Sequence, residues 1–234
     1  MAAPPPPQDA APVVRTAIRR VILIPGNGCS GVADLSDCMW YGWLTRCVKD
    51  ALGPQLEPDS LSEEGDIRTP VFPDPLYAHE SIWTDFCRNE LGLDEGTLII
   101  GHSSGAACAL RLMEKFRFAG CVLVAAYDSD LGDRLERESG YFNRPFNYKA
   151  MAENVPWVLQ FHSRDDHLVP IQCARRVADG LSTAFNGQPV TPGSDASSLA
   201  RRSTYVELDQ CGHFQEDEES DIWRHVEAQL KRPA

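Results

Sequence analysis

The chain has 234 residues, enough for one domain with a sizeable core, and its 43% hydrophobic and 24% charged residues are ordinary for a globular protein. A net charge of −12 argues against nucleic acid and anionic membrane surfaces as partners, because both repel a strongly acidic protein. No apolar stretch approaches the roughly 18 to 20 residues that a membrane-spanning helix needs. Composition therefore indicates no nucleic-acid or membrane partner and leaves small-molecule chemistry open.

The cysteines and the N-terminal segment bear on location and domain organisation. Eight cysteines are scattered without a Cys-x-x-Cys pair, and no secretory signal precedes them, so we expect reduced thiols in a cytoplasmic protein. Residues 1–17 are rich in alanine and proline and predict a disordered tail, although a targeting role stays open. We expect a single domain over residues 18–234.

Strand-like and helix-like segments alternate along this domain. The expected strands are 21–24, 67–72, 97–100, 120–126, 157–161 and 204–208. The expected helices lie within 38–52 and at 79–91, 106–115, 171–181 and 222–230. This alternation predicts an α/β fold with a doubly wound, mainly parallel sheet.

Two stretches interrupt the alternation. Residues 128–155 carry charges, aromatic residues and Pro145, and we expect a small helical cap there, over the active edge of the sheet. Residues 186–203 are rich in Pro, Gly, Ser and Thr and predict a mobile surface loop. Neither stretch marks a second domain.

The most informative motif is Gly101-His102-Ser103-Ser104-Gly105. A short apolar run precedes it and a segment rich in helix formers follows it. A serine on a sharp turn between a strand and a helix is a nucleophile elbow, and the small flanking glycines avoid collisions at such a turn. The pattern predicts Ser103 as a nucleophile. An ordinary glycine-rich turn in a parallel sheet is the alternative.

A nucleophilic serine needs a base, and the base needs an acid that orients it. In doubly wound hydrolases the order along the chain is serine, acid, histidine. The loop after the expected strand 157–161 contains two candidates, Asp165 and Asp166. We prefer Asp166, because the following x-x-Val-Pro places it at the strand end just before the next helix. Asp165 would then cap a helix or be solvated.

The expected base is His213, in the loop between the last strand and the closing helix. Gly212 can supply the tight turn that points the imidazole back across the edge of the sheet. The other five histidines fit less well: His102 lies inside the elbow, His162 and His167 flank the acid, and His79 and His225 lie on expected helices.

An acyl-transfer site also needs N–H donors for the oxyanion. We expect the backbone N–H of Ser104 and that of Asn27, with Gly28 as the next choice; a plain glycine turn at Pro25-Gly-Asn-Gly28 is the alternative. Trp40-Tyr-Gly-Trp43 could line an acyl pocket or belong to the core. No spacing typical of a metal site or a phosphate loop appears, so we expect no metal and no organic cofactor.

Several of these motifs occur together in one known family. They are Pro25-Gly-Asn-Gly28, Trp40-Tyr-Gly-Trp43, Ile99-Ile-Gly-His-Ser-Ser-Gly105, Ser129-Asp-Leu-Gly-Asp133 and Cys211-Gly-His-Phe-Gln215. From residue 21 to the end, apart from 186–203, the chain resembles the retinoblastoma-binding protein 9 family, serine hydrolases of the α/β-hydrolase fold. The resemblance implies a triad of Ser103, Asp166 and His213.

The sequence thus predicts a serine hydrolase that cleaves a small ester, thioester or amide through an acyl-enzyme on Ser103. Carboxylesterase-like activity is expected, with amidase or aminopeptidase-like activity as an option. The alternative is a protein-interaction module on a hydrolase scaffold that binds a retinoblastoma-type pocket protein, since a member of the family is described as binding the retinoblastoma protein through Leu-x-Cys-x-Glu. The matching segment here is Leu91-Gly-Leu-Asp-Glu95, where Leu93 replaces the cysteine, so we do not expect that partner.

Overall fold

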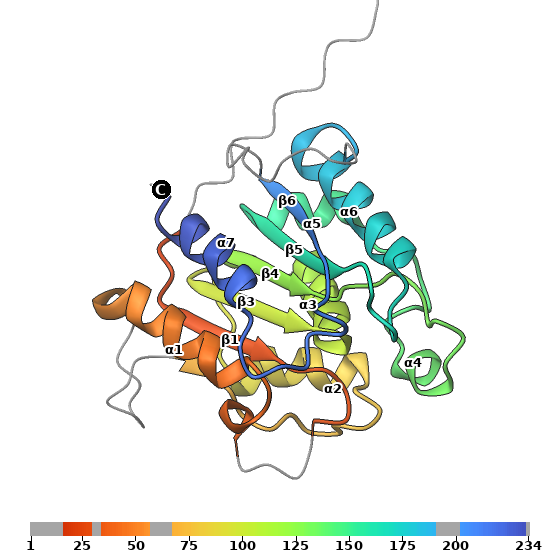
Figure 1. The fold of residues 1–234 in the computed structure, drawn as a ribbon, viewed down its shortest axis with the longest axis horizontal. Helices are drawn as coiled ribbons and strands as arrows, with labels where there is room; N and C mark the ends of the chain where they lie inside the picture. The colour runs from red at the N-terminus through yellow and green to blue at the C-terminus, as the bar shows by residue number, and fades with distance from the viewer. Residues whose placement is uncertain (1–15, 30–33, 57–66, 191–201, 233–234) are drawn as a thin grey trace, which may run out of the picture.

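A computed structural model describes residues 16–29, 34–56, 67–190 and 202–232. These residues form a six-stranded, all-parallel sheet in the order β2-β1-β3-β4-β5-β6 (Figure 1). The strands are β1 (Arg20–Ile24), β2 (Ile67–Arg68), β3 (Thr97–His102), β4 (Gly120–Val124), β5 (Val158–Ser163) and β6 (Ser203–Leu208). The predicted fold class is confirmed.

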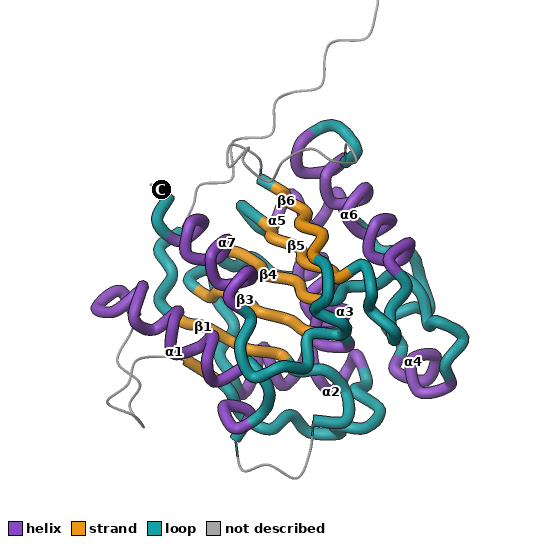
Figure 2. Tube along the Cα trace, in the orientation of Figure 1, coloured by secondary structure: helices purple, strands orange, loops and turns teal. Residues whose placement is uncertain are grey.

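Helices cover both faces of this sheet. They are α1 (Tyr41–Leu52), α2 (Glu80–Asp85), α3 (Ser104–Lys115), α4 (Arg134–Ser139), α5 (Tyr148–Asn154), α6 (Ile171–Asn186) and α7 (Ser220–Leu230). Helix α1 packs with α7, whereas α3 packs with α2 and α5, and α5 with α6. Figure 2 shows α1 and α7 on one face of the sheet and α3 and α5 on the other.

The central strands read as continuous apolar runs because both of their faces are covered. All six residues of β3 and all five of β4 are buried. The carboxyl ends of parallel strands meet at one edge of a sheet, and loops at that edge commonly carry the functional residues of such folds. The elbow after β3 and the loops after β1, β5 and β6 therefore converge.

The structure departs most from the expected elements at β2, α2 and α6, and elsewhere the bounds differ by up to two or three residues. Strand β2 has only two residues of the expected 67–72. Helix α2 ends at Asp85 and continues as a π-helical segment, Phe86–Glu90. Helix α6 continues to Asn186, because Leu181 and Phe185 keep its apolar face buried beyond the expected end. Most of the expected tail and of the expected loop 186–203, namely residues 1–15 and 191–201, lies outside the described residues.

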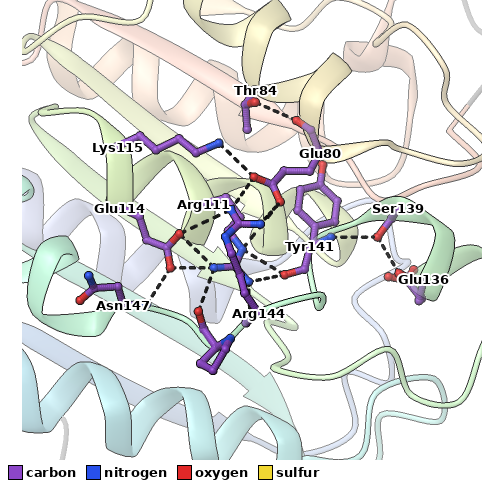
Figure 3. Close-up of polar contacts among 11 residues, drawn as sticks. Glu80, Thr84, Arg111, Glu114, Lys115, Glu136, Ser139, Tyr141, Arg144 and Asn147 are labelled. Atoms are coloured by element: carbon purple, nitrogen blue, oxygen red, sulfur yellow. Dashed lines mark hydrogen bonds and ion pairs between the residues drawn. The ribbon is translucent and has the colours of Figure 1, made fainter.

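The crossover from β4 to β5, where we expected a cap, divides into two parts. Helix α4 lies at the active edge, whereas α5 packs in the helical layer beside α3 and α6. The chain between them is fastened to α3 by Arg111, whose fully buried guanidinium donates to the carbonyl oxygens of Tyr141, Arg144 and Pro145 (Figure 3). Arg144 in turn binds Glu80 of α2 at 2.7 and 2.8 Å.

Candidate active site

Ser103 stands on a strained turn between β3 and α3. Its backbone has φ 55° and ψ −120°, a left-handed conformation that costs a non-glycine residue about 1–3 kcal/mol. The turn is held by the Ser103 N–H, which donates to the Val124 carbonyl of β4 at 3.0 Å. A Cβ at Gly105 would lie 2.2 Å from the Ile24 carbonyl oxygen, so α3 can approach β1 this closely only with glycine there.

The structure brings Ser103, His213 and Asp166 together from three different loops. His213 Nε2 lies 3.0 Å from Ser103 Oγ, and His213 Nδ1 lies 2.9 and 3.0 Å from the two Asp166 carboxylate oxygens. All three side chains are buried or nearly so, with Ser103 9% and His213 5% exposed. In this arrangement Asp166 accepts from Nδ1–H, which leaves Nε2 free to accept the proton of the serine hydroxyl.

Asp166 is fixed as an ionised acceptor. Its Oδ1 also accepts from the backbone N–H groups of Leu168 and Val169, each at 2.9 Å. Burial alone would raise the pKa of Asp166, but the hydrogen bond and charge of His213 and the two backbone donors leave it below the usual value. The carboxylate is therefore charged at neutral pH.

Asp165, the other acid candidate, makes no hydrogen bond to His213 within the described residues. Its carboxylate accepts from the Ser163 hydroxyl and, at 3.2 Å, from the Gly212 N–H. It caps no helix, because Pro170 occupies the N-cap of α6. Asp165 is exposed, but it is not only solvated, because its bond to the Gly212 N–H helps to hold the loop that carries His213.

A second hydrogen-bond chain, which sequence reasoning missed, runs beneath the serine. The Gly26 N–H donates to the Tyr41 hydroxyl at 3.1 Å, and that hydroxyl donates to His102 Nδ1 at 2.7 Å. His102 Nε2 then donates to the His213 carbonyl at 3.0 Å. Burial, followed by the proximity of His213, lowers the pKa of His102 to about 3, so the ring stays neutral. No local motif signals a link between residues so distant in sequence.

The loop after β1 lies directly against Ser103. A Cβ at Gly26 would be 3.3 Å from Ser103 Cβ. The Gly26 N–H is bound to Tyr41, and the Gly28 N–H donates to the Pro75 carbonyl at 2.7 Å. The Asn27 N–H has no acceptor among the described residues. The Ser104 N–H lies in the first turn of α3, where backbone donors have no partner within the helix.

A buried carboxylate, also missed, adjoins this loop. Glu136 of α4 is 8% exposed, and its oxygens accept from the side chains of Asn27, Ser104 and Tyr127. Burial raises its pKa, against the opposing effect of the Tyr127 and Ser104 hydroxyls. It belongs to no recognisable motif, and only its place in the expected cap hinted at a role.

The aromatic residues at the start of α1 belong to the core. Trp40 and Tyr41 are fully buried, and Trp40 Nε1 donates to the Phe214 carbonyl at 2.8 Å, which helps to hold the histidine loop. Of the two readings of this segment, the structure therefore favours the core over an acyl-pocket wall.

Within the described ranges, no group of three or more His, Cys, Asp or Glu side chains is arranged to hold a metal ion. The helices found in that part of the chain include none with the length and hydropathy to span a membrane.

An all-parallel sheet with a strained serine between a strand and a helix defines the class of α/β-hydrolases, and comparison with solved structures agrees. The ydeN gene product of B. subtilis matches with a TM-score of 0.66 at 20% identity, over 92% of this chain and 100% of that chain. The esterase RhEst1 from Rhodococcus sp. ECU1013 matches with a TM-score of 0.54 at 15% identity, over 93% and 92% of the two chains. At these identities the likeness shows the fold.

Sequence comparison identifies the family. Models of protein families give no match. The serine hydrolase RBBP9 of Rattus norvegicus, however, is 36% identical over 211 residues, which cover 90% of this chain and 95% of the rat protein. The chain belongs to the RBBP9 family and is a serine hydrolase, which confirms the resemblance predicted from its motifs.

Proposed function

We propose that Ser103 is the nucleophile, His213 its general base and Asp166 the acid that orients the base. The observation that carries this proposal is the unbroken hydrogen-bond chain from Asp166 through His213 to Ser103 Oγ, with heavy-atom distances of 2.9 to 3.0 Å. These distances suit proton transfer in a serine hydrolase.

In the proposed reaction His213 Nε2 takes the proton of Ser103 as Oγ bonds to the substrate carbonyl carbon. The N–H groups of Asn27 and Ser104 receive the negative charge on the carbonyl oxygen; both are free of acceptors within the described part of the chain. His213 then protonates the leaving group, and the carbonyl–leaving-group bond breaks to give an acyl-enzyme. Water, deprotonated by His213, releases the acid and restores Ser103.

The proposed substrate is a small ester, thioester or amide, and carboxylesterase-like activity is the first to test. A cytoplasmic location stays a prediction from the sequence. We do not propose a retinoblastoma-type partner: Leu93, which replaces the motif cysteine, is 1% exposed, and Leu91 is 6% exposed. A partner could reach these side chains only if the segment left the core.

The proposal is tested by labelling with a fluorophosphonate probe and mapping the adduct by peptide mass spectrometry. We expect the adduct on Ser103, and its loss in Ser103→Ala and His213→Gln. His167→Gln is the matched control, because this exposed histidine adjoins Asp166 without touching the chain of contacts. Asp166→Asn should slow labelling much more than Asp165→Asn. An adduct on another residue, or none on folded wild type, would contradict the proposed mechanism.

A further inference from the structure

We propose that Glu136 is a positioning residue that sets the geometry of the oxyanion hole from helix α4. The inference rests on the proposed function, because it concerns Asn27 and Ser104, the two residues whose N–H groups receive the oxyanion there.

Three side-chain donors converge on this one carboxylate. Oε1 accepts from Asn27 Nδ2 and from the Ser104 hydroxyl, each at 3.2 Å, and Oε2 accepts from the Tyr127 hydroxyl at 2.6 Å. The donors come from the loop after β1, the elbow and the segment after β4. Glu136 is therefore the point at which three separate segments of the active edge are joined.

The two oxyanion-hole residues share one acceptor atom, and this shared bond has a geometric consequence. Asn27 lies in a loop that is held on either side by the Gly26 and Gly28 N–H groups, and Ser104 lies at the start of a helix, but no backbone hydrogen bond within the described residues joins the two directly. Holding both side chains on the same oxygen limits how far the loop can move relative to the helix. Oxyanion donors act only within a narrow range of distance and direction, so such a limit raises the rate of the chemical step.

The surroundings of Glu136 do not suggest a role in a stabilising ion pair. A buried carboxylate is normally paired with a cation, but within the described ranges its partners are the neutral side chains of Asn27, Ser104 and Tyr127. Burying a charge among neutral donors costs free energy, and here every one of those donors belongs to the active edge. We therefore assign these three hydrogen bonds to Glu136 a role in active-site geometry rather than in the stability of the fold.

Helix α4 holds the carboxylate in place from the other side. The Asp133 side chain caps the helix by accepting from the N–H groups of Leu135 and Glu136, at 2.7 and 3.1 Å. The Ser139 hydroxyl donates to the Glu136 carbonyl at 2.6 Å, and the next turn of chain leads to Tyr141, which Arg111 binds (Figure 3). Glu136 is thus connected through Ser139, Tyr141 and Arg111 to α3, the helix that also carries Ser104.

The first test measures kcat and KM with p-nitrophenyl acetate for Glu136→Ala and Glu136→Gln. Glu138→Gln is the matched control, because Glu138 lies on the same helix and its side chain is 43% exposed. We expect Glu136→Ala to lower kcat about 10- to 100-fold with KM changed less than about twofold. Glu136→Gln, which keeps one acceptor oxygen, should recover part of that loss. A role in stability alone would lower the melting temperature and leave kcat per folded molecule unchanged.

A double-mutant cycle sharpens the test. Asn27→Ala removes the side-chain amide and keeps the backbone N–H. If Glu136 acts through Asn27, the two alanine variants combined should cost less than the product of their separate effects. Independent, multiplicative losses would contradict an action through Asn27.

A readout without catalysis separates this proposal from the proposed function. Hydrogen exchange in peptides covering residues 24–28 should be about tenfold faster in Glu136→Ala than in wild type, and unchanged in Glu138→Gln. Inactive wild-type protein would refute the proposed function, while the exchange result would still decide whether Glu136 holds the loop. Unchanged exchange together with unchanged kcat would overturn the positioning role.

Discussion

Ser103, the proposed nucleophile, combines a strained backbone with a side-chain contact to His213. A positive φ is unfavourable for any side chain with a Cβ, yet it lifts the hydroxyl out of the strand and toward His213. The unfavourable conformational free energy of this residue is offset by the packing of the strand and the helix on either side of it. Its size can be measured apart from any effect on catalysis by comparing two inactive variants.

We predict that Ser103→Gly is more stable than Ser103→Ala by about 1 kcal/mol, because glycine adopts this backbone conformation without strain. Denaturant unfolding of the two variants gives the difference. Ala184→Gly in the last turn of α6 is the control, where the same change should lower the free energy of unfolding by up to about 1 kcal/mol. Equal stability of the two Ser103 variants would mean that the elbow is relaxed.

Glu219 is a second residue in an unfavourable environment, because its carboxyl group is buried. It is buried at the start of α7, and its Oε1 has no hydrogen-bond partner in the described part of the chain. Burial, with repulsion from Glu216 and Asp221, raises its pKa from 4.5 to about 7. Between these two values the folded protein keeps a proton that the unfolded chain has released, so stability falls as the pH rises through this window.

It follows that Glu219→Gln should exceed wild type in free energy of unfolding by about 2 kcal/mol at pH 8, and by little near pH 4. Denaturant unfolding across that pH range measures the difference, with the exposed neighbour Glu218→Gln as control. A constant offset between the Glu219 variant and wild type at all pH values would show that the carboxyl does not titrate abnormally.

At the scale of elements, the crossover from β4 to β5 depends on Arg111. Its guanidinium uses the fork of donors to satisfy three backbone carbonyl groups and Glu114, while it stacks at 4.0 Å on the Phe146 ring. An ammonium group is a compact donor that cannot reproduce this planar set of contacts. The crossover therefore needs arginine itself and not only a positive charge.

We expect Arg111→Lys to lower the free energy of unfolding by about 2–4 kcal/mol, because buried carbonyl groups lose their donors. Thermal and denaturant unfolding measure it. Arg224→Lys, at a side chain that is 72% exposed and pairs with Asp221 of its own helix, should change stability by less than about 0.5 kcal/mol. A similar decrease in the free energy of unfolding in both variants would show that the planar guanidinium of Arg111 is not required for the crossover.

The elements that the sequence predicted best are those with strong local patterns. The strand, turn and helix around Ser103 combine an apolar run, two glycines and helix formers, and the structure has all three. The two-residue β2 and the π-helical end of α2 were not predictable, because pairing partners and packing, not local propensity, set their limits.

The residues of the candidate site likewise divide into those that local sequence patterns predicted and those that they did not. Ser103, Asp166 and His213 could be singled out because each follows a strand and the parallel sheet brings strand ends together. Tyr41 and Glu136 could not, because their contacts join segments 61 and 109 residues apart in sequence. The role of the triad itself stays a prediction until the nucleophile is labelled.

For the molecule as a whole, the excess of acidic residues produces a negative electrostatic potential around the protein. A net charge of −12 repels anionic substrates on approach and leaves neutral ones unaffected. Added salt screens this repulsion, since the Debye length falls from about 10 Å at 0.1 M to about 3 Å at 1 M.

We therefore predict that kcat/KM for a nitrophenyl ester bearing a carboxylate rises a few-fold from low to moderate salt, whereas that for p-nitrophenyl acetate stays constant. Steady-state assays at a series of salt concentrations, with both esters on one enzyme preparation, test this. A parallel response of the two esters would indicate a salt effect on the enzyme and not on the encounter.

The contact at Gly105 has a consequence for how this protein can diversify. Because α3 contacts the end of β1 main chain to main chain, the spacing between Ser103 and the loop after β1 depends on backbone atoms that nearly every substitution leaves in place. Most positions of the crossover from β4 to β5 can therefore vary without moving these main-chain atoms, with Glu136 as the exception through its bonds to Asn27 and Ser104. A side chain at Gly105, in contrast, would force α3 away from β1 and shift Ser103 with it.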